Sequence, residues 1–245
     1  MKVIVLADYE AVSKEAARLV EEKVSENDQL VLGLATGSTP LGLYENLIDG
    51  YKTRGISYQN VKTINLDEYL GLEKDHPESY HTFMVEKLFK HIDIARENTF
   101  IPDGQPSSIE AECARYEKVM NRVGPINLQI LGIGSNGHIG FNEPGTDPES
   151  ETHVVELNDS TRKDNAQFFN SIEEVPTHAI TLGIQNILKS DKIILLASGK
   201  KKAEAIKILL EKNVSASFPA SYLWNHPNVT VIVDEDAYQL VRQKQ

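Results

Sequence analysis

The 245-residue chain is predicted to form a doubly wound α/β fold, in which a mostly parallel sheet carries helices on both faces. Short apolar runs alternate with longer amphipathic stretches along the chain, as they do in consecutive βαβ units. Most of the short runs are apolar and β-branched at successive positions, which is typical of strands buried on both faces. No repeat, low-complexity segment or change in composition divides the chain, so we expect a single domain over residues 1–245.

The predicted elements follow one another in regular order. Strands are expected at 2–7 (KVIVLA), 30–35 (LVLGLA), 61–66 (VKTINL), 126–131 (INLQIL), 178–182 (HAITL), 192–197 (KIILLA) and 229–233 (VTVIV). Helices are expected at 10–25, 40–54, 80–91, 109–122, 160–169, 200–212 and 235–242. Ser107 and Glu110 have capping-box spacing before one helix, and Pro40 suits the first position of another.

Composition excludes several classes of protein. Lys and Arg number 25 against 36 Asp and Glu, which gives a net charge of -11. Nucleic acid and anionic membranes require a basic face, so neither is an expected partner. Cys113 has no second cysteine with which to form an internal disulfide, and no segment approaches the ~20 apolar residues of a membrane span. We therefore expect a cytoplasmic protein.

Ligands of open α/β sheets bind beyond the carboxyl ends of the strands, so the loops there are the first candidates. After strand 30–35 the chain reads TGSTP, and Gly37, Ser38 and Thr39 precede a helix. Hydroxyls and free helix N–H groups there suit a phosphate, although an ordinary N-cap turn explains this motif equally well.

An acidic pair follows strand 61–66. Asp67 could be a catalytic base with Glu68 beside it. For this pair taken alone, a helix N-cap or a solvated turn is the favoured interpretation.

A glycine-rich loop follows strand 126–131. Its GIGSNG pattern resembles a dinucleotide-binding fingerprint, but the following residues 138–144 (HIGFNEP) oppose the helix that such a site requires, so we reject a nicotinamide or flavin cofactor. The loop instead presents Asn136, His138 and Glu143, a set that favours an acid/base site over a structural histidine. The spacing is that of neither a zinc protease nor a serine hydrolase, and we expect no metal.

Two basic residues complete the candidate set. Lys202 lines up with the apolar stripe of helix 200–212 near its start, where an anion would offset its unfavourable interaction with the helix dipole. A lysine that snorkels to solvent is the alternative. Arg162, near the start of helix 160–169, would be a second phosphate clamp beside an anion and a surface charge otherwise.

The irregular stretch 140–151 carries prolines and glycine, which predicts a long surface loop. We expect residues of about 140–171 to form a mobile lid.

Over nearly its whole length the chain resembles the glucosamine-6-phosphate deaminase family. The motifs that carry the resemblance are 35–40 (ATGSTP), 65–69 (NLDEY) and above all 137–143 (GHIGFNE). The related 6-phosphogluconolactonases continue differently after the glycine-histidine loop and carry Arg after the acidic pair, where this chain has Tyr69.

The resemblance implies a Rossmann-like sugar-phosphate isomerase fold and an enzyme that converts glucosamine 6-phosphate and water to fructose 6-phosphate and ammonia without a cofactor. Asp67 would be the base at C2, His138 would assist ring opening, and Glu143 would hold or polarise it. By the same resemblance Thr39, Arg162 and Lys202 would hold the phosphate.

The chain departs from the family pattern at two positions. Asn136 stands where many members have Asp, so it can orient His138 without supplying charge. Near the end of the chain, residues 223–226 (LWNH) differ from the Leu-Gln-x-His pattern that the family leads us to expect, with Trp224 in place of Gln. Allosteric members carry basic residues after the FNEP motif, whereas residues 145–152 here are acidic, so we expect a short, non-allosteric type. The family contains monomers and homo-oligomers, and the sequence favours neither.

Overall fold

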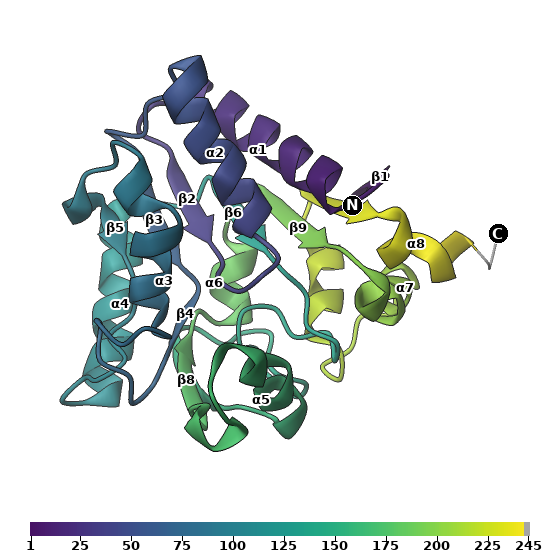
Figure 1. The fold of residues 1–245 in the computed structure, drawn as a ribbon. Coiled ribbons are helices and arrows are strands. Elements are labelled where there is room, and N and C mark those ends of the chain that lie inside the picture. The colour runs from purple at the N-terminus through teal and green to yellow at the C-terminus, as the bar shows by residue number, and fades with distance from the viewer. Residues whose placement is uncertain (243–245) are drawn as a thin grey trace.

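The computed structural model describes residues 1–242, and a parallel sheet of seven strands forms its centre (Figure 1). The strands lie in the order β1 (Lys2–Leu6), β10 (Val229–Asp234), β9 (Ile193–Ala197), β6 (Leu128–Leu131), β2 (Val31–Leu34), β3 (Lys62–Asn65) and β5 (Thr99–Phe100). Every neighbouring pair runs parallel. The doubly wound, mostly parallel fold is therefore confirmed, and only the short β5 of this sheet was not predicted.

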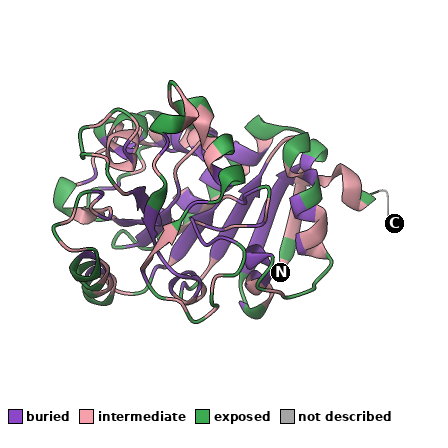
Figure 2. Ribbon diagram, turned by 90° about the horizontal axis from the view of Figure 1, so that it is seen from below, coloured by how far each residue is buried: buried purple, intermediate pink, exposed green. Residues whose placement is uncertain are grey.

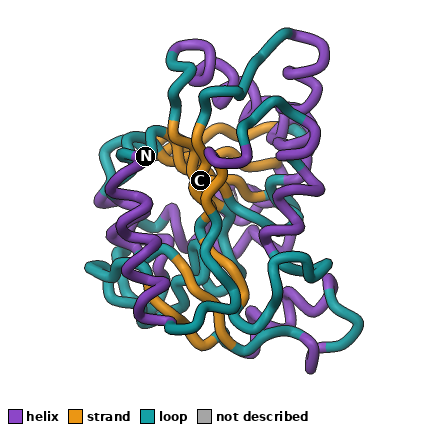
Figure 3. The backbone as a smooth tube through the Cα atoms, turned by 90° about the vertical axis from the view of Figure 1, so that its left-hand side faces the viewer, coloured by secondary structure: helices purple, strands orange, loops and turns teal. Residues whose placement is uncertain are grey.

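Helices cover both faces of the sheet, as the tube view shows (Figure 3). One face carries α1 (Tyr9–Glu26), α2 (Leu41–Arg54) and α3 (Tyr80–Lys87), and the other carries α4 (Ile109–Val123), α6 (Ile184–Leu188), α7 (Ala203–Leu210) and α8 (Glu235–Arg242). Alternate residues of a strand enter the two cores, so Ile194 packs beside α1 while Leu195 packs beside α7. The strands are accordingly buried between exposed helix surfaces (Figure 2).

A second, antiparallel sheet lies at the carboxyl edge of the first. It consists of β4 (Asp67–Tyr69), β8 (His178–Thr181) and β7 (His153–Glu156). The strand predicted at 178–182 forms, but its grouping with the parallel strands was wrong. Ala179 and Ile180 are fully buried, and such a run has the same appearance in either sheet.

Several helix starts differ from the prediction. Ser108 rather than Ser107 caps α4, because its hydroxyl accepts from the N–H of Ala111 at 3.2 Å. Pro40 is the N-cap residue of α2 and not its first helical residue. α5 (Asp159–Asn165) continues into a 3-10 turn, Ala166–Phe168, and α7 is preceded by another, Lys200–Lys202. Further 3-10 turns span Phe89–His91, Arg96–Asn98, Ile172–Glu174 and Pro219–Asn225.

Trp224 closes the carboxyl end of α7. Its indole N–H donates to the carbonyl of Leu209 at 2.7 Å, and the Lys212 ammonium lies 5.0 Å from the ring centroid. The tryptophan therefore satisfies a helix-end carbonyl and does not enter the cavity described below. Among residues 1–242, none of the helices combines the length and apolar content that crossing a bilayer requires.

Candidate active site

A cavity of about 1040 Å³ lies between the carboxyl edge of the large sheet and α5. The predicted residues that line it are Gly37, Ser38, Thr39, Asp67, His138 and Lys202. They follow the carboxyl ends of β2, β3, β6 and β9 along the chain, as the rule for parallel sheets predicts, and Asp67 is the first residue of β4. Asn136 and Glu143 do not line the cavity, but they contact His138 directly or through one another.

The loop at 36–40 meets the start of α2, a 14-residue helix whose N-cap residue, Pro40, supplies no capping side chain. Gly37 has φ +86°, which a residue with a Cβ rarely adopts. The hydroxyl of Tyr9 donates to the carbonyls of Ser38 and Thr39 and accepts from the N–H of Gly42 at 2.7 Å. A helix start that follows an anchored glycine turn and lacks a capping side chain at its N-cap residue is suited to binding an anion. Sequence reasoning missed Tyr9, since it precedes the loop by about thirty residues.

Asp67 and Glu68 have different surroundings, because adjacent residues of a strand point to opposite sides. Asp67, 6% exposed, faces the cavity, and burial followed by the charge of Glu68 raises its pKa to about 8. Glu68 accepts the N–H groups of Tyr69, Tyr80 and His81, each at 2.9 Å. Burial raises the pKa of Glu68 to about 7 against the opposing effect of these three bonds. Glu68 thus holds the start of α3, while Asp67 is available to a ligand.

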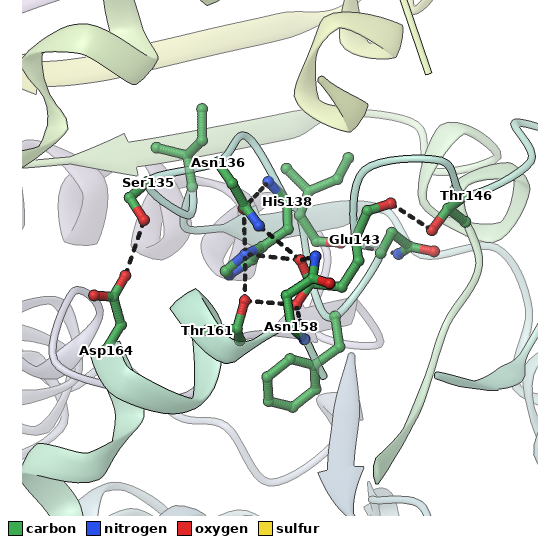
Figure 4. Close-up of polar contacts among 12 residues, drawn as sticks. Ser135, Asn136, His138, Glu143, Thr146, Asn158, Thr161 and Asp164 are labelled. Carbon is green, nitrogen blue, oxygen red and sulfur yellow. Dashed lines mark hydrogen bonds and ion pairs between the residues drawn. The ribbon is translucent and has the colours of Figure 1, made fainter. Parts of the chain in front are cut away.

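Asn136 orients His138 (Figure 4). The amide oxygen of Asn136 lies 2.8 Å from Nδ1 of His138 and also accepts the main-chain N–H of His138 at 3.1 Å. The amide nitrogen donates to Oε2 of Glu143 at 2.7 Å, which fixes which end of the amide is the oxygen. Nδ1 of His138 must therefore carry the hydrogen, and Nε2 is left to exchange a proton with a ligand.

Glu143 is bound by the start of α5. Its carboxylate accepts from Thr161 Oγ1, from Asn158 N at 3.2 Å and from Asn158 Nδ2 at 2.9 Å (Figure 4). Asn158 is the N-cap residue of α5, yet its side chain makes no cap bond. Asn158 and Thr161 were not predicted as site residues. The sequence did contain a signal for the helix start, since Asn is a common N-cap residue and Thr161 follows it by three positions.

Charges around His138 act in opposite directions. Burial lowers the pKa of His138, Lys202 lowers it further, and Glu143 and Asp164 oppose this. Nδ1 of His138 lies 3.9 Å from Oε2 of Glu143, with Asn136 bridging the two. The neutral imidazole is thus the favoured form, which is the form that accepts a proton.

Lys202 lies at the basic end of the cavity. Its ammonium donates to the carbonyl of Ile133 at 2.7 Å, and burial lowers its pKa. Lys163 and Lys201, which the sequence analysis did not select, also line the cavity. The snorkelling alternative does not describe Lys202, since its ammonium is held inside the site.

Arg162 is directed away from this end of the cavity. Its guanidinium donates to the carbonyls of Ile172 and Val175 at 2.9 and 3.0 Å. Thr161 and Asp164, three positions apart, occupy the helix face toward the glycine-rich loop, so Arg162 falls on another face. In this conformation Arg162 does not line the cavity.

The residue types of the site also bear on metal binding. Within residues 1–242, no group of three or more His, Cys, Asp or Glu side chains is placed to hold a metal ion.

Because Asp67, the ring of His138 and the start of α2 line one cavity at the carboxyl edge of a parallel sheet, the protein has the site of an α/β enzyme. More specifically, the chain belongs to the family described as glucosamine-6-phosphate isomerases/6-phosphogluconolactonase, which it matches over residues 7–232. The family resemblance inferred from the motifs is confirmed.

Similar proteins match along their full length. The chain is 54% identical over 241 residues to a glucosamine-6-phosphate deaminase of Geobacillus sp. (strain WCH70), covering 98% of this chain and 96% of that one. It is 52% identical over 240 residues to glucosamine-6-phosphate deaminase 1 of Bacillus subtilis (strain 168), covering 98% and 99%. A solved structure of a monomeric glucosamine-6-phosphate deaminase superposes with a TM-score of 0.97 at 52% identity, covering 98% of this chain and all of that one. The 6-phosphogluconolactonase of Trypanosoma brucei shares the fold, with a TM-score of 0.80 at 20% identity over 98% of both chains.

Proposed function

We propose that the protein is a glucosamine-6-phosphate deaminase, which converts glucosamine 6-phosphate and water to fructose 6-phosphate and ammonia. The observation that carries the proposal is that Asp67 and the ring of His138 line one cavity with the anion-binding loop 36–40. The names of full-length relatives at 52–54% identity support it.

The phosphate would bind at the start of α2, with Gly37, Ser38, Thr39 and the ammonium of Lys202 as its ligands. An anchor remote from the reacting carbons lets binding energy orient C1 and C2. Arg162 could join these ligands only after it releases the carbonyls of Ile172 and Val175. Such a release would accompany movement of the lid predicted at 140–171, which stays a prediction.

His138 would open the sugar ring. Its Nε2 accepts the proton of the C1 hydroxyl and returns a proton to the ring oxygen, which leaves an open-chain aldehyde with no net change in protons. Asn136 and Glu143 keep Nδ1 protonated during this exchange. General acid–base catalysis of this kind contributes about 10²–10⁴-fold in rate.

Asp67 would then move a proton between two carbons. Its carboxylate removes the proton at C2 while the substrate's own ammonium group passes one proton to O1, which gives a neutral enolamine; the proton held by Asp67 then goes to C1, which gives an iminium ion at C2. Water hydrolyses the iminium ion to the ketone and ammonia in its protonated form, so the overall equation balances. Because its pKa is raised to about 8, Asp67 is a stronger base than an exposed aspartate.

One further property is proposed with this activity. We propose a monomer, following the monomeric glucosamine-6-phosphate deaminase whose structure superposes with a TM-score of 0.97. A cytoplasmic location and the absence of nucleic-acid, membrane and cofactor requirements stay predictions from the sequence.

The test measures ammonia and fructose 6-phosphate together after addition of glucosamine 6-phosphate without metal. Equal release of both is expected, and Asp67→Asn should lower it by about 10²–10⁴-fold while the exposed Asp75→Asn should not. Acid release from 6-phosphogluconolactone without ammonia from the amino sugar would instead identify a lactonase. Binding of either sugar phosphate without turnover would identify a sensor or a silent binding protein.

A further inference from the structure

Helix α5 is attached to the glycine-rich loop, here residues 132–143, at both of its ends. Near its start, Asn158 and Thr161 donate to the Glu143 carboxylate. At its other end, Ser135 donates to Asp164 at 3.0 Å (Figure 4). The helix and the loop therefore hold each other in place around His138.

The hydrogen bonds on Glu143 leave little acceptor capacity for His138. One oxygen accepts from Thr161 and Asn158 N, and the other accepts from Asn136 and the Asn158 amide. A carboxylate has about four acceptor positions, and all four are filled by neutral donors. Its charge is thus shared among them, and it stays 3.9 Å from Nδ1 of His138.

We propose that Asn158 and Thr161 are positioning residues for the ring-opening step: they hold Glu143 away from direct contact with His138, so that Asn136 receives the Nδ1 hydrogen at 2.8 Å, while the Thr161 hydroxyl lies farther away, 3.5 Å from the same nitrogen. This rests on the proposed function of the site. Neither residue needs to contact the reacting carbons, because Asn158 acts through Glu143, and Thr161 acts through Glu143 and through its own 3.5 Å approach to Nδ1 of His138. The position of the start of α5 therefore affects the hydrogen bonding of His138.

Removal of one hydrogen-bond donor from Glu143 should change the pKa of His138 in one direction. Glu143 is buried, so an oxygen without a partner is costly and turns to the nearest remaining hydrogen, on Nδ1 of His138. Direct contact with a carboxylate stabilises the imidazolium. The other charged groups that act on His138, Lys202 and Asp164, are unchanged by such a substitution. The pKa of His138 should therefore rise, and less neutral imidazole is available to accept the sugar proton.

The experiment follows the histidine signals of ¹⁵N-labelled protein during a pH titration, with His138→Gln to assign the signal. Thr161→Val removes the hydroxyl at equal size and should raise the His138 midpoint by roughly 0.5–1 unit. Thr161→Ser keeps the hydroxyl and should titrate as the wild type does. Thr146→Val is the matched control, since the Thr146 hydroxyl donates to the main-chain carbonyl of Glu143 and not to its carboxylate.

Kinetics supply a second readout. Thr161→Val and Asn158→Ala should each lower kcat by about 3–10-fold at pH values well below the wild-type His138 midpoint, which is the full effect of a 0.5–1 unit rise, with KM changed less than twofold. The acidic limb of the pH profile should move upward with the NMR midpoint. An unchanged midpoint in both variants, or equal shifts in Thr161→Ser and Thr161→Val, would overturn the proposal. If the wild type lacks deaminase activity, the titration still decides the positioning role while the proposed function fails.

Discussion

Replacement of Asp67 by Asn should stabilise the protein at neutral pH while it removes the proposed base. Burial and the neighbouring Glu68 raise the Asp67 pKa from 3.8 to about 8. Between these two values the native protein keeps a proton that the unfolded chain releases, so stability from this group is fully present below about pH 4 and is lost as the pH rises toward 8. At about 1.36 kcal/mol per unit, roughly 4 kcal/mol is lost by pH 7.

Urea unfolding at pH 4.5 and 7.5 measures this effect. Asp67→Asn should exceed the wild type in free energy of unfolding by roughly 3–4 kcal/mol more at pH 7.5 than at pH 4.5. The exposed Asp75→Asn should show no such pH-dependent difference. Turnover of Asp67→Asn should fall by about 10²–10⁴-fold, and wild-type kcat/KM should rise with pH up to about 8.

An equal stability difference between Asp67→Asn and the wild type at both pH values would refute the raised pKa of Asp67. Asp67 would then be charged in the native protein from low pH, and burial would not be what sets its basicity. Turnover near the wild-type rate in Asp67→Asn would separately remove it from the chemistry.

The remaining predictions concern binding, packing and regulation. Lys202→Met should raise KM for the sugar phosphate about tenfold or more and weaken competition by inorganic phosphate equally, whereas a change in kcat alone would place Lys202 outside the phosphate site. Gly137→Ala should lower the thermal midpoint, because Gly137 has φ +85° and an added Cβ would lie 2.3 Å from a ring carbon of Phe218; an unchanged melting curve would contradict this. Trp224→Phe should cost about 1–2 kcal/mol in urea unfolding with activity retained, since it removes the bond to the α7 carbonyl. Rate curves should be hyperbolic, with N-acetylglucosamine 6-phosphate without effect, because residues 145–152 are acidic; activation by this compound would refute the non-allosteric assignment.

Hydrophobic runs predicted the large sheet well and the small sheet poorly. Strands β9 and β10 are buried on both faces, and a continuous run of apolar residues predicts such a strand directly. The run at 178–182 has the same character, but its partners β4 and β7 contain charged residues and are only three and four residues long. Short polar strands carry no periodic signal, so neither they nor the sheet they form could be inferred.

Loop chemistry predicted which residues meet, and it did not predict their orientation. Asp67, His138 and Lys202 line one cavity because the carboxyl ends of parallel strands share an edge. Arg162 was selected for its charge, yet its direction depends on how α5 is rotated about its axis. Asn158 and Thr161 contact Glu143 through tertiary structure that connects segments more than a dozen residues apart, and local patterns do not encode such contacts.

The small sheet sets the distance between the two groups that would move protons. Thr181 of β8 pairs with Asp67, its hydroxyl accepts from the N–H of Phe141 at 3.2 Å, and the carbonyl of Leu182 accepts from Asn142 at 2.8 Å. The positions of Asp67 and of the glycine-rich loop are thus both fixed by contacts with the end of β8, whereas loop 36–40 follows a strand of the large sheet. In the binding mode proposed above, the sugar phosphate spans both sheets. The distance between the two sheets would then select the length of the substrate. A sugar phosphate one carbon shorter would bind its phosphate at loop 36–40 but could not bring its reactive carbons to Asp67.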